Sequence, residues 1–181
     1  MLLDIDGKMG NFGDPVKKVF YDSASKLFQL GMRSMHFNEY VEIIKKCFET
    51  EGMGLNDDEL KLATRSFLQF CPAFCEYERD HFGFIHLSLQ DNIGIIAAVN
   101  CGPDVKEGYD SYIRNRDDAT KKRYFECLAA KNHPPQKWFN YFVEGGIVDA
   151  TNVVSFMEVV TEKNITLTEN NVRKITALIP H

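Results

Sequence analysis

The stretch Met35-His36-Phe37-Asn38-Glu39-Tyr40 lies where a loop is expected to run into a helix, and it decides the fold prediction. From its third residue onward, apolar side chains recur at helical spacings: Phe37, Tyr40, Val41, Ile44, Cys47 and Phe48. Spacings of three and four residues indicate one face of an α-helix, whereas a strand would alternate. Gly52 and Gly54 follow and are expected to end this helix.

The same stretch resembles the closing half of an EF-hand calcium loop that runs into its exit helix. With Glu39 counted as the twelfth loop position, the apolar eighth position is Met35. The first, third and fifth positions, which supply oxygen ligands in an EF-hand, are Phe28, Leu30 and Met32. Because Ca²⁺ takes about six to eight oxygen ligands, the loop is expected to keep its shape without binding the ion.

A second loop with this spacing is predicted over residues 78–89, after a helix that would include Phe74 and Tyr77. Its first, third, sixth and eighth positions are Glu78, Asp80, Gly83 and Ile85. The twelfth position is Leu89, so the bidentate glutamate is missing. Calcium binding is therefore expected to be weak or absent, and Glu78 and Asp80 are the best remaining ligands.

A third loop is predicted over residues 141–152, with Gly146 at the sixth position, Asp149 at the ninth and Asn152 at the twelfth. Its early oxygen positions are Tyr141, Val143 and Gly145, none of which carries a carboxylate or an amide oxygen. Glu39, Asp149 and Asn152 are thus interpreted as vestiges of ligand positions. No metal and no other cofactor is expected.

The spacing as a whole resembles the sarcoplasmic calcium-binding proteins, the calexcitins and the juvenile hormone diol kinases. The resemblance runs from Asp14-Pro-Val-Lys-Lys-Val-Phe20 through Pro135-Gln-Lys-Trp-Phe-Asn-Tyr-Phe142 to Leu167-Thr-Glu-Asn-Asn-Val172. It implies an all-α fold with two lobes of EF-hand-like helix-loop-helix pairs. The expected organisation is a flexible tail (1–13), an N-terminal lobe (14–99), a linker (100–106) and a C-terminal lobe (107–181).

Other helices are expected from caps and periodicity. Asn56 to Glu59 read as a helix start with an acidic residue three positions after the cap. The inner face of that helix is predicted to hold Leu60, Ala63, Phe67 and Phe70. Further helices are expected over 119–130 and 135–142, and a last one is expected to contain Val172, Ile175, Leu178 and Ile179.

Composition excludes several function classes. The 181 residues carry a formal net charge of −5, with acidic and basic residues interspersed, so nucleic acid is not expected as a partner. The longest apolar stretches, such as 93–99, are far shorter than the roughly 20 residues of a membrane span. The start of the chain has neither a basic region nor a long apolar run, and we therefore expect a cytoplasmic protein.

Four aromatic residues stand close together at Trp138, Phe139, Tyr141 and Phe142. They cannot all face one side of a helix, because a buried stripe takes about three positions in two turns. Core packing accounts for some of them, and one or two could contact a ligand or a partner.

Four possible zinc ligands also cluster in the sequence, namely Cys71, Cys75, His81 and His86. The second cysteine and the first histidine are too close for a zinc finger, which needs about a dozen residues between them. Reduced thiols and loop histidines are the favoured interpretation, and zinc is the alternative.

These observations predict a non-enzymatic binding or regulatory protein, with no catalytic residues. Its partner would be a protein helix or a small lipophilic molecule held in a hydrophobic groove. The alternative is a small-molecule enzyme of the juvenile hormone diol kinase type, although the chain has no Gly-x-x-x-x-Gly-Lys-Ser/Thr loop. A competing resemblance is carried by Phe84-Ile-His-Leu-Ser-Leu-Gln-Asp91, which is similar to a helical segment found after the nucleotide-binding domain of NLR immune receptors.

Overall fold

The computed structural model describes residues 14–52, 54–100, 105–131 and 134–179. Contacts between residues divide the chain into two compact units, Met1–Gly94 and Ile95–His181. The division falls inside a single helix, α5 (Leu87–Val99), and each unit is described by itself. The predicted tail 1–13 and residues 101–104 of the predicted linker lie outside the described residues.

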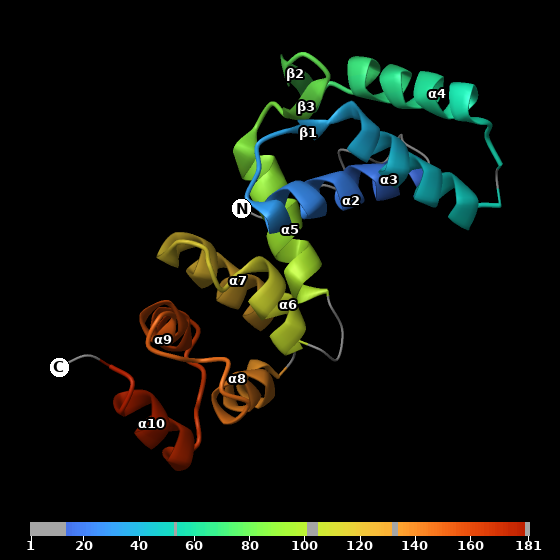
Figure 1. Cartoon of the computed structure of the whole chain (residues 1–181). Coiled ribbons are helices and arrows are strands. Elements are labelled where there is room, and N and C mark those ends of the chain that lie inside the picture. The colour runs from blue at the N-terminus through green and yellow to red at the C-terminus, as the bar shows by residue number, and fades with distance from the viewer. Residues whose placement is uncertain (1–13, 53, 101–104, 132–133, 180–181) are drawn as a thin grey trace. The chain divides into compact units, whose positions relative to one another are not determined.

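Most of the described chain is helical, as predicted, but the first unit also contains a small antiparallel sheet (Figure 1). Its elements before α5 are α2 (Asp14–Leu30), β1 (Met35–His36), α3 (Phe37–Thr50), α4 (Asp57–Phe70), β2 (Phe74–Glu78) and β3 (His81–Phe84). The strand order is β1-β3-β2. A helix, a strand, two helices and a β-hairpin with this strand order have the topology of a winged helix-turn-helix, in which α3 and α4 form the helix pair and β2–β3 the wing.

Helix α3 confirms the helix predicted after Met35. Its buried side chains are Phe37, Tyr40, Ile43, Ile44 and Cys47. His36 caps the helix, because its Nδ1 accepts a hydrogen bond from the backbone N–H of Asn38 at 3.2 Å. Just past the helix, Gly52 has a φ of +71°, a conformation that glycine adopts without the strain that a Cβ would cause.

Helix α4 begins as predicted. Asn56 accepts hydrogen bonds from the backbone N–H groups of Asp58 and Glu59, and the Glu59 carboxylate accepts one from the backbone N–H of Asn56. This reciprocal pair is a capping box, which satisfies donors that a helix start would otherwise leave free.

The helix predicted around Phe74 and Tyr77 is wrong, because these residues lie in strand β2. The two apolar residues are three apart, which a helix would accept, but the segment is rich in aromatic side chains that also suit a strand. Pairing with β3 decides between the two, with Phe74 opposite Phe84 and Cys75 opposite Gly83.

The contact between the first two predicted loops also differs from an EF-hand pair. Met35 and Ile85 hold the eighth positions and would be expected to meet, but Met35 pairs with Phe82 and His36 with His81. Ile85 instead lies after β3 and is 47% exposed. The sheet of the first unit therefore joins the two predicted loops, but in a register that does not pair their eighth positions, and β2 adds a third strand to it.

Aromatic rings fill the space between the sheet and the helices of the first unit. The ring of Phe74 lies 4.5 Å from that of Phe84, 5.7 Å from that of Tyr40 and 5.9 Å from that of Phe20, measured between centroids. The Tyr40 hydroxyl donates a hydrogen bond of 2.8 Å to the carbonyl of Phe82. These contacts pack α2 and α3 against the hairpin.

The second unit is helical in its described residues. It contains the end of α5, then α6 (Val105–Tyr112), α7 (Asp118–Lys131), α8 (Pro135–Glu144), α9 (Val153–Glu162) and α10 (Glu169–Thr176). The helices predicted over 119–130 and 135–142 are confirmed by α7 and α8. The last predicted helix is shorter than expected, since Leu178 and Ile179 lie beyond the end of α10.

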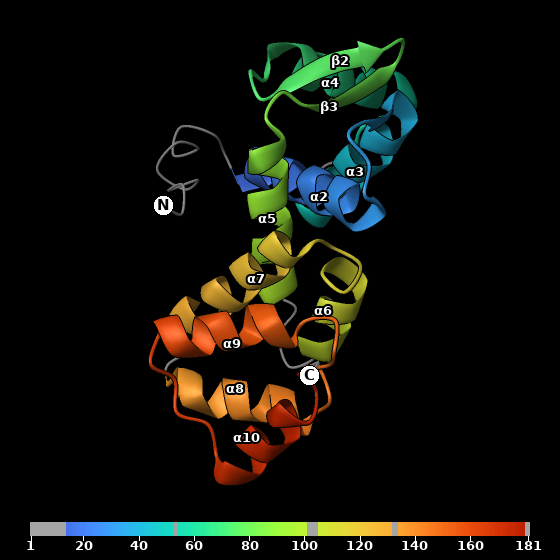
Figure 2. The ribbon, with the colours of Figure 1, turned by 90° about the vertical axis from the view of Figure 1, so that its left-hand side faces the viewer.

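Helices α7, α8 and α9 enclose the core of the second unit (Figure 2). Phe125 lies at its centre, with ring centroids 5.2 Å from Phe156, 6.3 Å from Phe139 and 6.4 Å from Phe142. All four rings are fully buried. Helix α10 packs on α8.

Candidate functional site

The first predicted loop does not gather ligands. Phe28 and Leu30 belong to α2, which ends only at Leu30. Glu39 lies in the first turn of α3 and forms an ion pair with Lys26. The hydrogen bond and the charge of that lysine hold the pKa of Glu39 below its usual range. This carboxylate therefore has a protein partner and connects α2 to α3.

The second predicted loop is the wing of the first unit. Glu78 ends β2 and Asp80 occupies the turn with a φ of 58°. The backbone N–H of Asp80 donates to the Glu76 carboxylate at 2.8 Å, and the carbonyl of Asp80 accepts from the N–H of Phe37 at 2.7 Å. The side chain of Asp80 lies 3.6 Å from the guanidinium of Arg65 on α4. Protein groups thus hold the turn of the second predicted loop, where weak or absent calcium binding was predicted.

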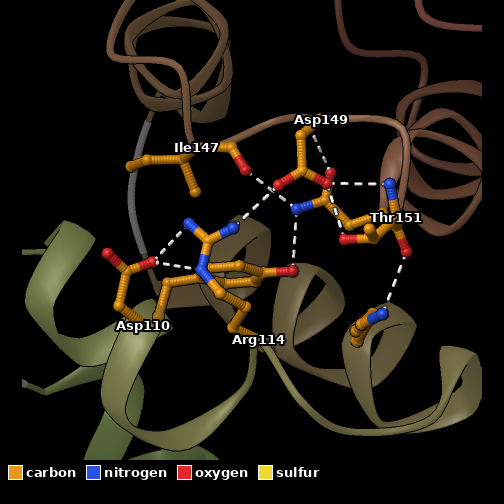
Figure 3. A network of polar contacts seen from close by, with 8 residues as sticks. Asp110, Arg114, Ile147, Asp149 and Thr151 are labelled. Atoms are coloured by element: carbon orange, nitrogen blue, oxygen red, sulfur yellow. Dashed lines mark hydrogen bonds and ion pairs between the residues drawn. The ribbon is translucent and has the colours of Figure 1, made fainter.

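The third predicted loop joins α8 to α9, and a buried asparagine holds it (Figure 3). Asn152 is 1% exposed. Its Nδ2 donates to the Tyr109 hydroxyl at 2.7 Å and to the carbonyl of Ile147 at 2.8 Å, and its Oδ1 accepts from the N–H of Asp149 at 2.9 Å. Asn152, the residue at the twelfth loop position, therefore forms hydrogen bonds with the backbone of its own loop and with Tyr109 of helix α6.

Asp149 extends this network (Figure 3). One carboxylate oxygen accepts from Arg114 at 2.8 Å, and the other accepts from the hydroxyl and the N–H of Thr151. Burial acts to raise the pKa of Asp149, but the hydrogen bonds from Thr151 and Arg114 outweigh it and the pKa is lowered. Arg114 also pairs with Asp110, and Lys121 donates to the carbonyl of Thr151 at 2.9 Å. The ninth loop position is thus neutralised by an arginine.

The possible zinc ligands do not form a site in the described part of the chain. Cys71 follows α4, Cys75 lies in β2, His81 in β3 and His86 just before α5. Within the described residues, no three His, Cys, Asp or Glu side chains come together as a metal site would require. The absence of metal itself stays a prediction.

The aromatic cluster at 138–142 divides into two faces of α8. Phe139 and Phe142 are fully buried and belong to the core. Trp138 is half-buried, Tyr141 is 49% exposed, and their rings lie 6.3 Å apart. Trp138 and Tyr141 are therefore the members of the cluster that a ligand or partner could reach.

A shallow groove of about 470 Å³ runs along the outer side of α9, between this helix and the last described turn. Its lining is mostly apolar and includes Val154, Met157 and Ile179. Glu158 and Glu162 also line the groove. Their carboxylates form ion pairs with the Nζ of Lys122, at 3.4 Å for Glu158 and 2.6 Å for Glu162. The groove is not at the aromatic cluster, and no pattern in the sequence indicates it.

A second surface is the outer face of α4, which we define as Asp58, Glu59, Leu62 and Phe70, since these positions lie on one side of the helix. Leu62 is 68% exposed and Phe70 is 82% exposed, the two highest values among the exposed large apolar residues that the structure describes. Phe70 was predicted on the inner face, and that prediction is wrong. It is the last residue of the helix, so the chain turns away before a neighbour can cover the ring.

The string Phe84 to Asp91 has a clear structural role. Phe84 is fully buried in β3, and the chain then enters α5. Gln90 is 4% exposed and donates from its Nε2 to the carbonyl of Met32 at 2.9 Å, just beyond the end of α2. One turn later, α5 approaches α2 so closely that a Cβ on Gly94 would lie 2.1 Å from Cγ of Phe28. Residues 84–94 therefore pack α5 against the helices and the sheet of the winged helix.

Comparisons with known proteins give no relative: no family model, no curated protein and no solved structure matches this chain. Within the described residues, no helix is long and apolar enough to cross a membrane.

Proposed function

We propose that this chain is a non-enzymatic regulatory segment of the kind that follows the nucleotide-binding domain in NLR immune receptors, and that it acts by binding protein surfaces. The observation that carries the proposal is the position of the NLR-like string. The string begins in the last strand of the wing, β3, and continues into α5. Three contacts hold α5 against the first unit: the buried ring of Phe84, the hydrogen bond from Gln90 to the Met32 carbonyl, and the close approach of Gly94, just beyond the string, to Phe28 of α2. The residues that resemble the NLR segment are thus the ones that connect the wing to α5.

The EF-hand resemblance is supported less well by the geometry. The second predicted loop has a strand in place of its entering helix, and the pairing of β1 and β3 has a different register from the one expected. Side chains hold the turn at Asp80 and the loop at Asn152. An ion is not needed to explain either conformation.

A winged helix can also bind DNA, but the charges on α4 favour a protein partner. In helix-turn-helix proteins the N-terminal residues of the second helix contact base edges in the major groove. Here that position carries Asp57, Asp58 and Glu59. Their negative charges would oppose the phosphate backbone, whose attraction to cationic side chains supplies most non-specific affinity.

A second candidate function is the binding of a small lipophilic ligand in the second unit. The apolar groove along α9 favours it. The groove is shallow, however, whereas sites for small molecules usually enclose most of their ligand. Binding of a protein surface is therefore the better-supported function.

The test is binding to a purified NLR nucleotide-binding domain from the same organism, measured by isothermal titration calorimetry. We expect a one-to-one complex with a micromolar Kd, because the described surfaces are small and partly polar. The absence of heat at the highest soluble concentration would contradict the proposal. A thermal-shift screen covers the alternatives: stabilisation by ATP would favour the enzyme, and stabilisation by fatty acids or terpenoid alcohols alone would favour a lipid carrier.

A further inference from the structure

We propose that the outer face of α4 docks an amphipathic protein helix that carries lysine or arginine beside its apolar stripe. This inference rests on the proposed function, since it names the surface and the chemistry of the partner. Apolar exposure and charge support it independently.

The apolar part of the surface consists of Leu62 and Phe70. Single exposed apolar residues are common on protein surfaces and need no partner. Here, however, the two highest exposures of large apolar side chains in the described chain fall on one helix of 14 residues. Covering a leucine and a phenylalanine removes two large apolar side chains from water, which favours the binding of a helix at this face.

The charged part of the surface is acidic. Asp57, Asp58 and Glu59 fill the first turn of α4 and are exposed. The positive end of the helix dipole and the exposed Lys61 one turn later together offset about one and a half charges, so the three carboxylates keep a net negative charge. Arg65 does not neutralise it, because this guanidinium lies 3.6 Å from Asp80 and 4.8 Å from the ring centroid of Phe37. A partner with basic residues complements this end of the helix.

The dimensions of α4 suit a helical partner. Its 14 residues extend for about 21 Å, at 1.5 Å per residue. A helix laid along this face reaches from the acidic turn to Phe70, with apolar residues spaced by three and four meeting Leu62 and Phe70. The groove along α9 is the weaker site for such a partner, because Lys122 already pairs with its two carboxylates.

The experiment uses the full chain and two synthetic peptides with the same leucine stripe, one flanked by lysines and the other by glutamates. Fluorescence anisotropy of labelled peptides measures binding. We expect the lysine peptide to bind at least tenfold more tightly than the glutamate peptide. We also expect Leu62→Ser and Phe70→Ser each to weaken its binding at least fivefold, and Asp57→Asn with Asp58→Asn to reduce the preference for lysine.

Val154→Ser is the matched control, because it removes an exposed apolar side chain in the α9 groove. Equal binding of the two peptides, no binding of either, or a loss of binding with Val154→Ser but not with Leu62→Ser would each overturn the inference. The same variants separate it from the proposed function. If the NLR domain binds and the α4 variants do not weaken the complex, the function stands and the α4 assignment fails.

Discussion

Replacing Gly94 with alanine is expected to lower the free energy of unfolding by about 3 kcal/mol, the upper end of the usual cost of overpacking a core. The added Cβ would lie 2.1 Å from Cγ and 2.5 Å from Cβ of Phe28, a side chain that is 1% exposed. The buried ring of Phe28 and helix α5 cannot move apart without disturbing the packing of α5 on α2. Alanine gains about 1 kcal/mol over glycine in helix propensity, which offsets only part of the cost. Urea denaturation followed by circular dichroism measures the change.

Two controls make the result specific to the close approach. Gly54→Ala adds a Cβ with nothing within 4 Å and should leave stability unchanged or slightly higher. Truncating the ring with Phe28→Ala removes the overlap with Cγ but keeps the Phe28 Cβ, 2.5 Å from the added methyl, so Gly94→Ala should become less costly without becoming harmless, with a coupling energy above about 1 kcal/mol in the double-mutant cycle. Additive effects of the two substitutions would show that α5 does not pack on α2 as described.

Replacing Asn152 with alanine is expected to lower the free energy of unfolding by about 3 kcal/mol, since each buried polar group left without a partner costs about 1 to 3 kcal/mol. The substitution removes the partners of the Tyr109 hydroxyl, the Ile147 carbonyl and the Asp149 N–H together. Burial raises the pKa of Tyr109, so its hydroxyl stays protonated at neutral pH and cannot gain a charge in compensation.

Asn170→Ala is the control for this prediction, because Asn170 is exposed on α10 and its loss should change stability by less than about 0.5 kcal/mol.

Differential scanning calorimetry of the wild-type protein in EDTA and in millimolar Ca²⁺ or Mg²⁺ should give one and the same midpoint. A midpoint raised by Ca²⁺ would mean that an ion, and not Asn152, holds the loop.

The helices with strong periodicity could be predicted from the sequence. Those that contain Tyr40, Phe125 and Phe139 have apolar faces several turns long, and such faces are buried wherever the helix packs. Helix α6 was not predicted, because its eight residues are mostly polar and include Gly108. The strand around Phe74 could not be read from its residues, since two aromatics three apart fit either structure until a pairing partner is known.

The candidate sites were predicted only in part. The sequence showed that the aromatics at 138–142 must divide between two faces, and the structure assigns Trp138 and Tyr141 to the outer one. It also identified Asp149 and Asn152 as loop positions, but their partners Arg114 and Tyr109 lie more than 30 residues away. The exposure of Phe70 was not visible, because helical spacing alone placed it with the inner residues.

The most direct test of the account is the pairing of Met35 in an NMR structure of the protein. A winged helix requires a nuclear Overhauser contact between the Hα protons of Met35 and Phe82, or of His36 and His81, together with cross-strand contacts between Phe74 and Phe84. We predict these contacts and extended backbone shifts over 74–78. Helical shifts over 74–78, with Met35 paired to Ile85, would contradict the winged helix and restore the EF-hand pair.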